Sequence, residues 1–282
     1  MEQKERQYAV ADAPTEQSYG PTDIMSAELR DCWQNPKGCR QPTKCNRGNT
    51  RKPNSHDECA ILTDMEDFDI RAVEAAISRL REIKTDIFGA NGHGFQMNPA
   101  LQESEAASFE RDHKIALPPD YRQFLTCVGN GGAGPFYGVF PLGLMDDNFD
   151  FRPWQENDGV VGNLLNPFTF QDEWNDLSGQ PDADLLKRNP EEYHRQIELF
   201  DARYWTSELV NGAVPICHEG CALSIWLVVT ENQAGQLWED RRSESAGLRP
   251  IRLADGSAAR FSQWYMEWLD NCFVKAGEHN WR

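Results

Sequence analysis

Hydrophobic positions are most clearly patterned in residues 117–143, LPPDYRQFLTCVGNGGAGPFYGVFPLG. After Pro118 and Pro119, which suit the first turn of a helix, four apolar side chains recur at intervals of three and four. Four glycines then fall between positions 129 and 134, as expected for backbone with positive φ or for contacts too close for a Cβ. Residues 136–142 are aromatic and β-branched, which predicts a buried strand after this glycine corner.

Helical periodicity dominates the segment before this unit. Apolar residues keep three- and four-residue spacing from Ile70 to Ile87, which predicts an amphipathic helix of about six turns. Residues 63–66 have the form of a capping box at its start, and the glycine-rich residues 89–94 end it. Residues 99–113 are predicted to form a second helix that is polar on most faces.

The second half of the chain changes from loops and helices to strands. Residues 182–200 are helical in character, and Pro190 begins a second helix there or kinks the first. Strands clustered after helices, with no regular βαβ alternation, predict an α+β fold: a single domain whose mainly antiparallel sheet is packed by helices. The remaining expected elements are an acidic loop at 146–165, an edge segment at 167–174, strands at 214–216, 222–230, 236–240 and 248–253, and a closing helix at 261–274.

The first 60 residues show neither helical nor strand periodicity. They are rich in Asn, Pro, Lys, Arg and Gln, which is typical of a linker or a disordered arm. Residues 30–52 hold seven Lys and Arg against one Asp, so the second half of the arm is basic. We therefore divide the chain into a disordered arm, residues 1–60, and an α+β domain, residues 61–282.

Charge is concentrated in one stretch of this acidic chain, whose net charge is −17. Residues 146–201 hold 14 Asp and Glu against four Lys and Arg, a local balance of −10. Such a field repels nucleic acid and favours a basic partner, although a solvated surface that aids solubility remains an equal alternative. A mean hydropathy of −0.67, no apolar run of membrane-spanning length and no secretory signal predict a cytoplasmic protein that binds neither membrane nor nucleic acid.

Eight cysteines raise the question of a metal site. The arm spaces four of them as C-x6-C-x5-C-x13-C, without the closely spaced ligand pairs that zinc sites use. Cys217 and Cys221 flank a third candidate ligand, His218, but no second pair is apparent, and cysteines beside strands are more often small core residues. We expect no metal and no cofactor. The four arm cysteines are Cys32, Cys39, Cys45 and Cys59.

Catalytic motifs are also missing from the sequence. It holds no phosphate-binding GxxxxGK[ST] loop, no HExxH and no GxSxG. Asp172 and Glu173 could act as an acid and a base, or His218 could contribute, but only a fold that sets their separation and shifts a pKa would make them do so. We therefore expect that the protein is not an enzyme.

Three motifs, in the order LPPDYRQFLTCVGNGGAGPFYGVFPLG, HEGCALSIWLVVTENQAGQLWED and FSQWYMEWLD, resemble the SUKH superfamily over residues 67–275. The resemblance implies an α+β fold and, for most bacterial members, an immunity protein that neutralises a polymorphic or contact-dependent toxin. Ala222 stands where the family often has a second glycine after its cysteine. The family's signature residues, which look mainly structural, correspond here to Leu117, Pro118, Tyr121, Phe124, Leu125, Asn130, Gly131, Gly132, Gly134, Pro135, Tyr137, Gly138, Gly220, Cys221, Val228, Gly235 and Trp238.

The resemblance and the charge together predict an immunity protein that acts as a monomer and binds a basic toxin domain, for example a nuclease, through its acidic surface. The alternative is a regulatory or scaffolding module whose basic arm recruits a cellular client. The expected toxin-binding residues are Asp146, Asp147, Asp150, Glu156, Asp158, Asp172, Glu173 and Asp176.

Overall fold

The computed structural model describes residues 68–83, 86–147, 150–278 and 281. All described residues belong to one compact unit, Pro53–Arg282. The predicted arm, its cysteines and the capping box at residues 63–66 lie outside the described residues. Within the described ranges, no helix has the length and apolar composition that a membrane crossing requires.

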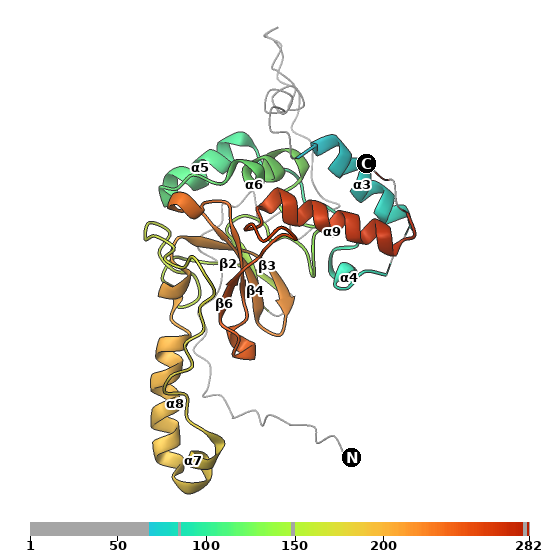
Figure 1. Cartoon of the computed structure of the whole chain (residues 1–282). Helices are drawn as coiled ribbons and strands as arrows, with labels where there is room; N and C mark the ends of the chain where they lie inside the picture. The colour runs from blue at the N-terminus through green and yellow to red at the C-terminus, as the bar shows by residue number, and fades with distance from the viewer. Residues whose placement is uncertain (1–67, 84–85, 148–149, 279–280, 282) are drawn as a thin grey trace. The chain divides into compact units, whose positions relative to one another are not determined.

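Two antiparallel sheets form the β part of this unit (Figure 1). The larger sheet has the order β3-β4-β5-β6, so the segment predicted as a central strand is central, and it is paired with the strand that follows it. The smaller sheet is a hairpin of β1 and β2. The strands are β1 Leu144–Asp147, β2 Asp150–Pro153, β3 Ala213–Gly220, β4 Leu223–Val228, β5 Leu237–Asp240 and β6 Leu248–Pro250.

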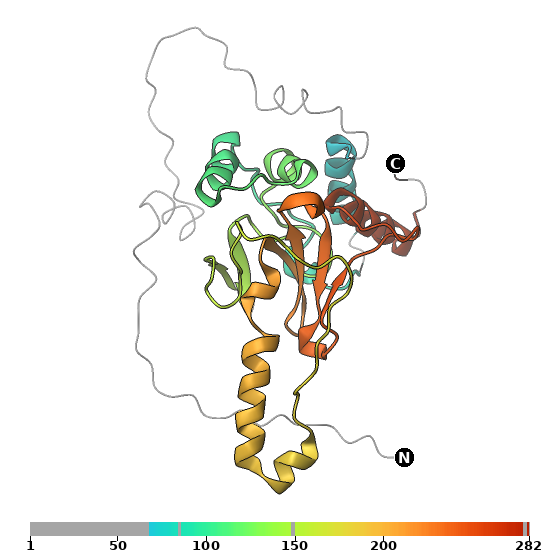
Figure 2. The ribbon, with the colours of Figure 1, turned by 60° about the vertical axis from the view of Figure 1, so that its left-hand side comes forward.

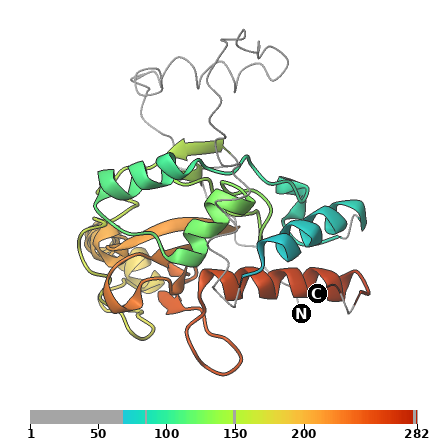
Figure 3. The ribbon, with the colours of Figure 1, turned by 90° about the horizontal axis from the view of Figure 1, so that it is seen from above.

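The helices surround the larger sheet and make the fold α+β, as predicted. Seen from above, α9 runs beside α3, and residues of the two helices are in contact (Figure 3). The helices are α3 Ile70–Ile83, α4 Ala90–His93, α5 Glu103–His113, α6 Pro119–Gln123, α7 Ala183–Arg188, α8 Pro190–Tyr204 and α9 Phe261–Lys275, with a π-helical turn η1 Phe124–Val128 after α6 and the 3₁₀ turns η2 Ser207–Val210, η3 Glu231–Gln233 and η4 Arg242–Glu244.

Aromatic packing dominates the core. The Phe261 ring of α9 lies 4.9 Å from the rings of both Tyr121 and Phe124, which joins the closing helix to the α6 segment. Elsewhere in the core, the Phe168 ring packs 4.8 Å from Trp238 of β5. Residues 225–229 of β4 and its end are all buried, which explains why this strand is continuously apolar rather than alternating.

The glycine corner has the conformation that its composition predicts. Gly131 and Gly132 have φ of 73° and 111°, and a Cβ on either would lie 2.5 Å from a backbone oxygen, of Val139 and Gln96 respectively. The Asn130 side chain accepts a hydrogen bond from the Leu142 backbone N–H at 2.8 Å. Asn130, Gly131 and Gly132 therefore fix a turn and a close backbone contact.

Three expected elements differ from the structure. The first helix, α3, has 14 residues and ends at Ile83, so Ile87 lies outside it. Further along, Gly89 turns the chain with φ of 78°, and no Cβ would fit there beside the Phe136 carbonyl. Residues 136–142 form a single bridge, Gly132 to Val139, instead of a strand, because Phe136 and Gly138 have positive φ. The acidic segment predicted as a loop from residue 146 begins inside the β1–β2 hairpin.

Helices α7 and α8 form a hairpin. Pro190 lies in the first turn of α8, so it begins a second helix, which is one of the two predicted alternatives. The side chains of Asp182 and Asn189 cap the two helices by accepting backbone N–H bonds. No residue of α7 is buried, and in α8 only Phe200 and Tyr204, in its last turns, are buried. Figures 1 and 2 show the hairpin extending away from the larger sheet, and most of its helical residues are exposed.

Candidate functional site

The eight acidic residues predicted to bind a toxin do not form one cluster. They divide among a groove along β6, the loops that follow β2, the tip of the β1–β2 hairpin and a pocket beneath that hairpin.

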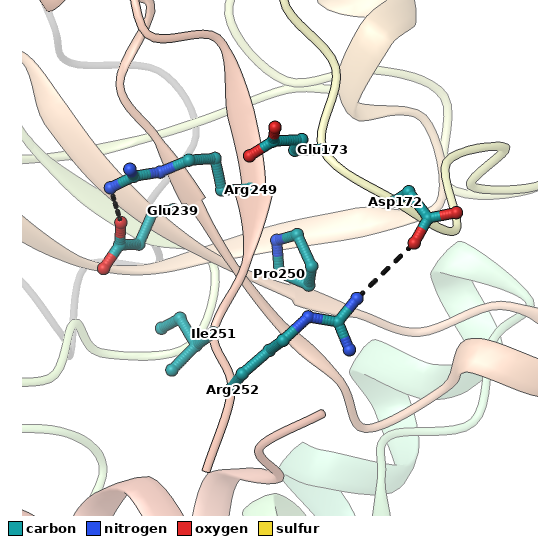
Figure 4. Close-up of a pocket in the computed structure, with 7 residues that line it drawn as sticks. All are labelled: Asp172, Glu173, Glu239, Arg249, Pro250, Ile251 and Arg252. Atoms are coloured by element: carbon teal, nitrogen blue, oxygen red, sulfur yellow. Dashed lines mark hydrogen bonds and ion pairs between the residues drawn. The ribbon is translucent and has the colours of Figure 1, made fainter. Parts of the chain in front are cut away.

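Asp172 and Glu173 line the groove along β6, whose volume is about 650 Å³ (Figure 4). The Asp172 side chain is 89% exposed, and its Oδ1 lies 3.6 Å from Nη2 of Arg252. On the other side of the groove, Arg249 donates to Glu239 at 2.8 Å. Asp172 and Glu173 are thus accessible carboxylates, and the two arginines beside them, Arg249 and Arg252, each already have an acidic partner.

The groove does not accept an additional strand. β6 is the edge strand of the larger sheet. The backbone N–H and C=O of Leu248 point away from the sheet, but both already form hydrogen bonds of 2.8 Å with the backbone of Trp174. This contact confirms the edge segment expected at residues 167–174, as a single bridge. Two residues further on, Pro250 has no N–H to donate. A partner must therefore be recognised here by side chains.

Three of the predicted residues are engaged in bonds within the protein. Glu156 accepts from the Leu164 backbone N–H at 2.9 Å and lies 2.7 Å from Nδ1 of His113. Asp158 accepts three backbone N–H bonds that shape its own loop, at 2.8 Å from Val161, 2.9 Å from Val160 and 3.3 Å from Gln155. Asp176 pairs with Arg203. Their carboxylates stabilise loops, which makes them less available to a partner.

Asp147 and Asp150 lie directly opposite each other at the turn of the β1–β2 hairpin. Their backbone positions place them at one end of the smaller sheet.

Asp146 lines a pocket of about 480 Å³ beneath the hairpin. Its side chain is only 9% exposed, and its Oδ2 lies 2.9 Å from Nε2 of His218. The His218 ring stacks on the rings of Tyr137 and Phe140, with centroids 4.8 and 5.7 Å away. The aromatic contacts and the carboxylate together fix the orientation of the imidazole.

A row of polar side chains forms the floor of this pocket. His218 of β3 is opposite Ser224 of β4, which is opposite Asp240 of β5, so the three share one face of the sheet. Asp240 is buried and accepts two hydrogen bonds from the Arg242 guanidinium, at 2.9 and 2.6 Å. Arg242 Nη1 also donates to the backbone oxygens of Tyr204 and Thr206, and the guanidinium stacks on the Trp205 ring at 5.2 Å.

The pocket ends at the turn that joins β3 to β4. Cys221 and Ala222 are the two residues of this hairpin loop, and both have left-handed backbone, with φ of 52° and 58°. The Cys221 thiol is free and exposed, whereas Cys217 is buried in the core, as expected for a small apolar residue, and burial raises the pKa of its thiol. In the described part of the chain, no group of three His, Cys, Asp or Glu is arranged to hold a metal ion.

Sequence analysis identified Asp146 and His218 separately but did not pair them, and it missed the Asp240–Arg242 pair and Trp205. The register of β4 and β5 would have placed Ser224 opposite Asp240. The contact between Asp146 and His218 joins residues 72 positions apart and has no local signal.

Comparisons of the chain with models of protein families, with curated proteins and with solved structures gave no match.

Proposed function

We propose that this protein is a cytoplasmic immunity protein that binds one cognate toxin domain and blocks its activity. The observation that carries the proposal is the exposure of acidic side chains that outnumber the basic ones between residues 172 and 201. This stretch holds nine Asp and Glu against three Lys and Arg. All of these acidic residues except Asp176 and Glu192 are exposed.

The toxin domain that best fits such a surface is a nuclease. Nucleases hold phosphates with Lys and Arg, so their active sites carry the charge that this surface complements. Complementary charges accelerate association and select the partner, whereas burial at the centre of the interface supplies most of the affinity. The resemblance of three sequence motifs to the SUKH superfamily supports the same function.

Asp172, Glu173 and the acidic residues of the α7–α8 hairpin are the first contacts that we propose. Glu156 and Asp158 already hold backbone N–H groups, so neutralising them would disturb loops before it affected a partner. The hairpin adds residues that the expected set did not include: Asp184, Glu191, Glu198 and Asp201.

The test is co-expression of the full chain with the toxin domain encoded by the neighbouring gene, followed by a growth assay and isolation of the complex. We expect rescued growth and a 1:1 complex. A variant that reverses three charges, Asp172→Lys, Glu173→Lys and Glu191→Lys, should associate about tenfold more slowly at low salt. A folded chain that neither rescues growth nor forms a complex would refute the proposal.

A matched control separates the surface from the overall charge of the chain. Glu74, Glu82 and Glu267 are exposed residues of α3 and α9, and reversing their charges changes the net charge by the same amount. We expect this control to associate nearly as fast as the parent. Deletion of residues 1–60 tests the alternative: an immunity protein tolerates the deletion, whereas a module recruited through its basic arm loses its function.

A further inference from the structure

One face of α8 carries acidic side chains that form no ion pair with a described Lys or Arg side chain. Glu191, His194, Glu198, Asp201 and Trp205 are spaced by three, four, three and four residues, and all are exposed. At 100° per residue, these side chains fall within an arc of about 80° and extend over about 21 Å. We call these five residues the α8 stripe.

The basic side chains of the hairpin are engaged away from this stripe. Arg195 pairs with Glu192, Lys187 with Asp184 and Arg203 with Asp176, while Arg188 donates to the Asp184 backbone oxygen. Among the described residues, no basic side chain pairs with Glu191, Glu198 or Asp201. The stripe therefore has three carboxylates whose charge is compensated by solvent alone.

The stripe leads into the pocket beneath the β1–β2 hairpin. Trp205, at its C-terminal end, is 40% exposed and also lines that pocket, together with Asp146 and Trp226. One face of the Trp205 ring already holds the Arg242 guanidinium. An indole that binds one cation and remains partly exposed suits a second cationic group.

Two buried polar atoms in the pocket walls lack partners among the described residues. Oδ1 of Asp146 accepts no hydrogen bond from them, and the Nε1–H of Trp226 donates none. A buried carboxylate oxygen without a partner costs free energy, which a charged donor recovers on binding. The smaller sheet that carries Asp146 contacts the larger sheet through β1 and β3.

We infer that the α8 stripe and this pocket form one binding surface for a basic segment of a protein partner, and that a Lys or Arg side chain of the segment enters the pocket beside Asp146. The inference rests on the proposed function for the identity of the partner, a toxin domain, but the chemistry of the surface is independent of it.

A cationic occupant fits the pocket better than an anionic one. Of the acidic side chains that line it, Asp240 is already neutralised by Arg242, which leaves the Asp146 carboxylate with unused acceptor capacity. An anion would face Asp146 and, outside the pocket, the carboxylates of the stripe. Arg152 also lines the pocket, and its positive charge opposes the entry of more than one cation.

The inference can be tested without a toxin. An acetylated, amidated hexa-arginine peptide is about 20 Å long when extended, which matches the stripe. Its binding to the full chain is measured by isothermal titration calorimetry at low salt, with hexa-glutamate as the negative probe. The variants are Asp146→Asn, Trp205→Leu and a stripe triple, Glu191→Gln, Glu198→Gln and Asp201→Asn. The control triple, Glu74→Gln, Glu82→Gln and Glu267→Gln, changes the net charge by the same amount, and thermal unfolding verifies that each variant is folded.

We expect the stripe triple and Asp146→Asn each to weaken peptide binding about tenfold, Trp205→Leu severalfold, and the control triple less than twofold. Equal weakening by the two triples would overturn the inference, because it would show attraction by net charge alone. Unchanged binding in Asp146→Asn would exclude the pocket.

The same variants separate this inference from the proposed function. If the toxin domain binds and is neutralised but none of the site variants weakens its complex, the inference fails while the proposed function stands. If the peptide maps to the stripe and the pocket but no toxin is neutralised, the surface stands and the proposed function fails.

Discussion

His93 is a residue whose environment makes stability depend on pH. Its Nδ1 accepts the Phe95 backbone N–H at 3.0 Å, and burial lowers its pKa to about 4 from the ordinary 6.5. Between these values the folded chain holds fewer protons than the unfolded chain, so stability falls as the pH is lowered from 6.5 towards 4 and is unaffected by His93 above 6.5.

We expect His93 to remove about 2 kcal/mol of stability between pH 7 and pH 4.5, discounted for its partial exposure. His93→Asn keeps an acceptor for the Phe95 N–H but does not titrate in this range. Urea unfolding at the two pH values should therefore show a smaller loss for the variant than for the parent. Equal losses would mean that other groups carry the pH dependence.

The backbone of Cys221 and Ala222 is strained in the turn between β3 and β4. Both have the left-handed backbone that a two-residue hairpin requires, and a residue with a Cβ is about 1 kcal/mol less stable there than glycine. Ala222→Gly should therefore raise the free energy of unfolding by about 1 kcal/mol. Ala75→Gly, at an exposed position of α3, should lower it by about the same amount. A loss of stability in both variants, measured by chemical denaturation, would show that the turn is unstrained.

At the scale of elements, one buried carboxylate joins two helices. Asp120 of α6 is 3% exposed, and its Oδ2 accepts the Ser262 backbone N–H at the start of α9 at 2.9 Å. Oδ1 accepts the Tyr121 N–H at the same distance. The carboxylate satisfies an N–H group that the first turn of α9 cannot satisfy internally, and its negative charge suits a helix N-terminus.

Asp120→Ala should lower the free energy of unfolding by about 2–3 kcal/mol, because it removes a charged acceptor and leaves buried donors unpaired. Asp120→Asn retains one acceptor oxygen and should lose about half as much. Thermal and urea unfolding measure both. A loss below about 0.5 kcal/mol in Asp120→Ala would indicate that water replaces the carboxylate.

The elements that the sequence predicted well are those whose signal is local. The β4–β5 hairpin, the start of α8 at Pro190 and the apolar stripe of α9 depend on neighbours within a few residues. Residues 136–142 failed as a strand because three-dimensional contacts at the glycine corner, and not their own β propensity, decide their backbone. The Asp120–Ser262 bond and the Asp146–His218 contact could not be predicted, because both join segments far apart in sequence.

The candidate surface was only partly predictable, because its charges can be counted in the sequence but its long-range contacts cannot. Counting charges located the acidic stretch but could not separate carboxylates that hold loops, such as Asp158, from those that face solvent, such as Asp172. That distinction depends on which backbone N–H groups the fold brings near. The spacing of Glu191, Glu198 and Asp201 was visible in the sequence, but only the described ion pairs show that the bases of the hairpin are engaged elsewhere.

At the scale of the whole molecule, the charge distribution predicts how the complex with a basic toxin domain responds to salt. The acidic side chains are exposed, so their attraction acts before contact and is screened over the Debye length, which is about 10 Å at 0.1 M salt. We expect the association rate constant to fall by at least about tenfold between roughly 0.02 and 0.2 M salt, while the dissociation rate constant changes much less. Surface plasmon resonance or stopped-flow fluorescence measures both rates.

The α8 stripe triple should flatten this dependence and the control triple should not, because the stripe faces the partner and the control positions do not. A complex whose salt dependence lies entirely in dissociation would contradict charge steering and would place its acidic residues within the buried interface instead.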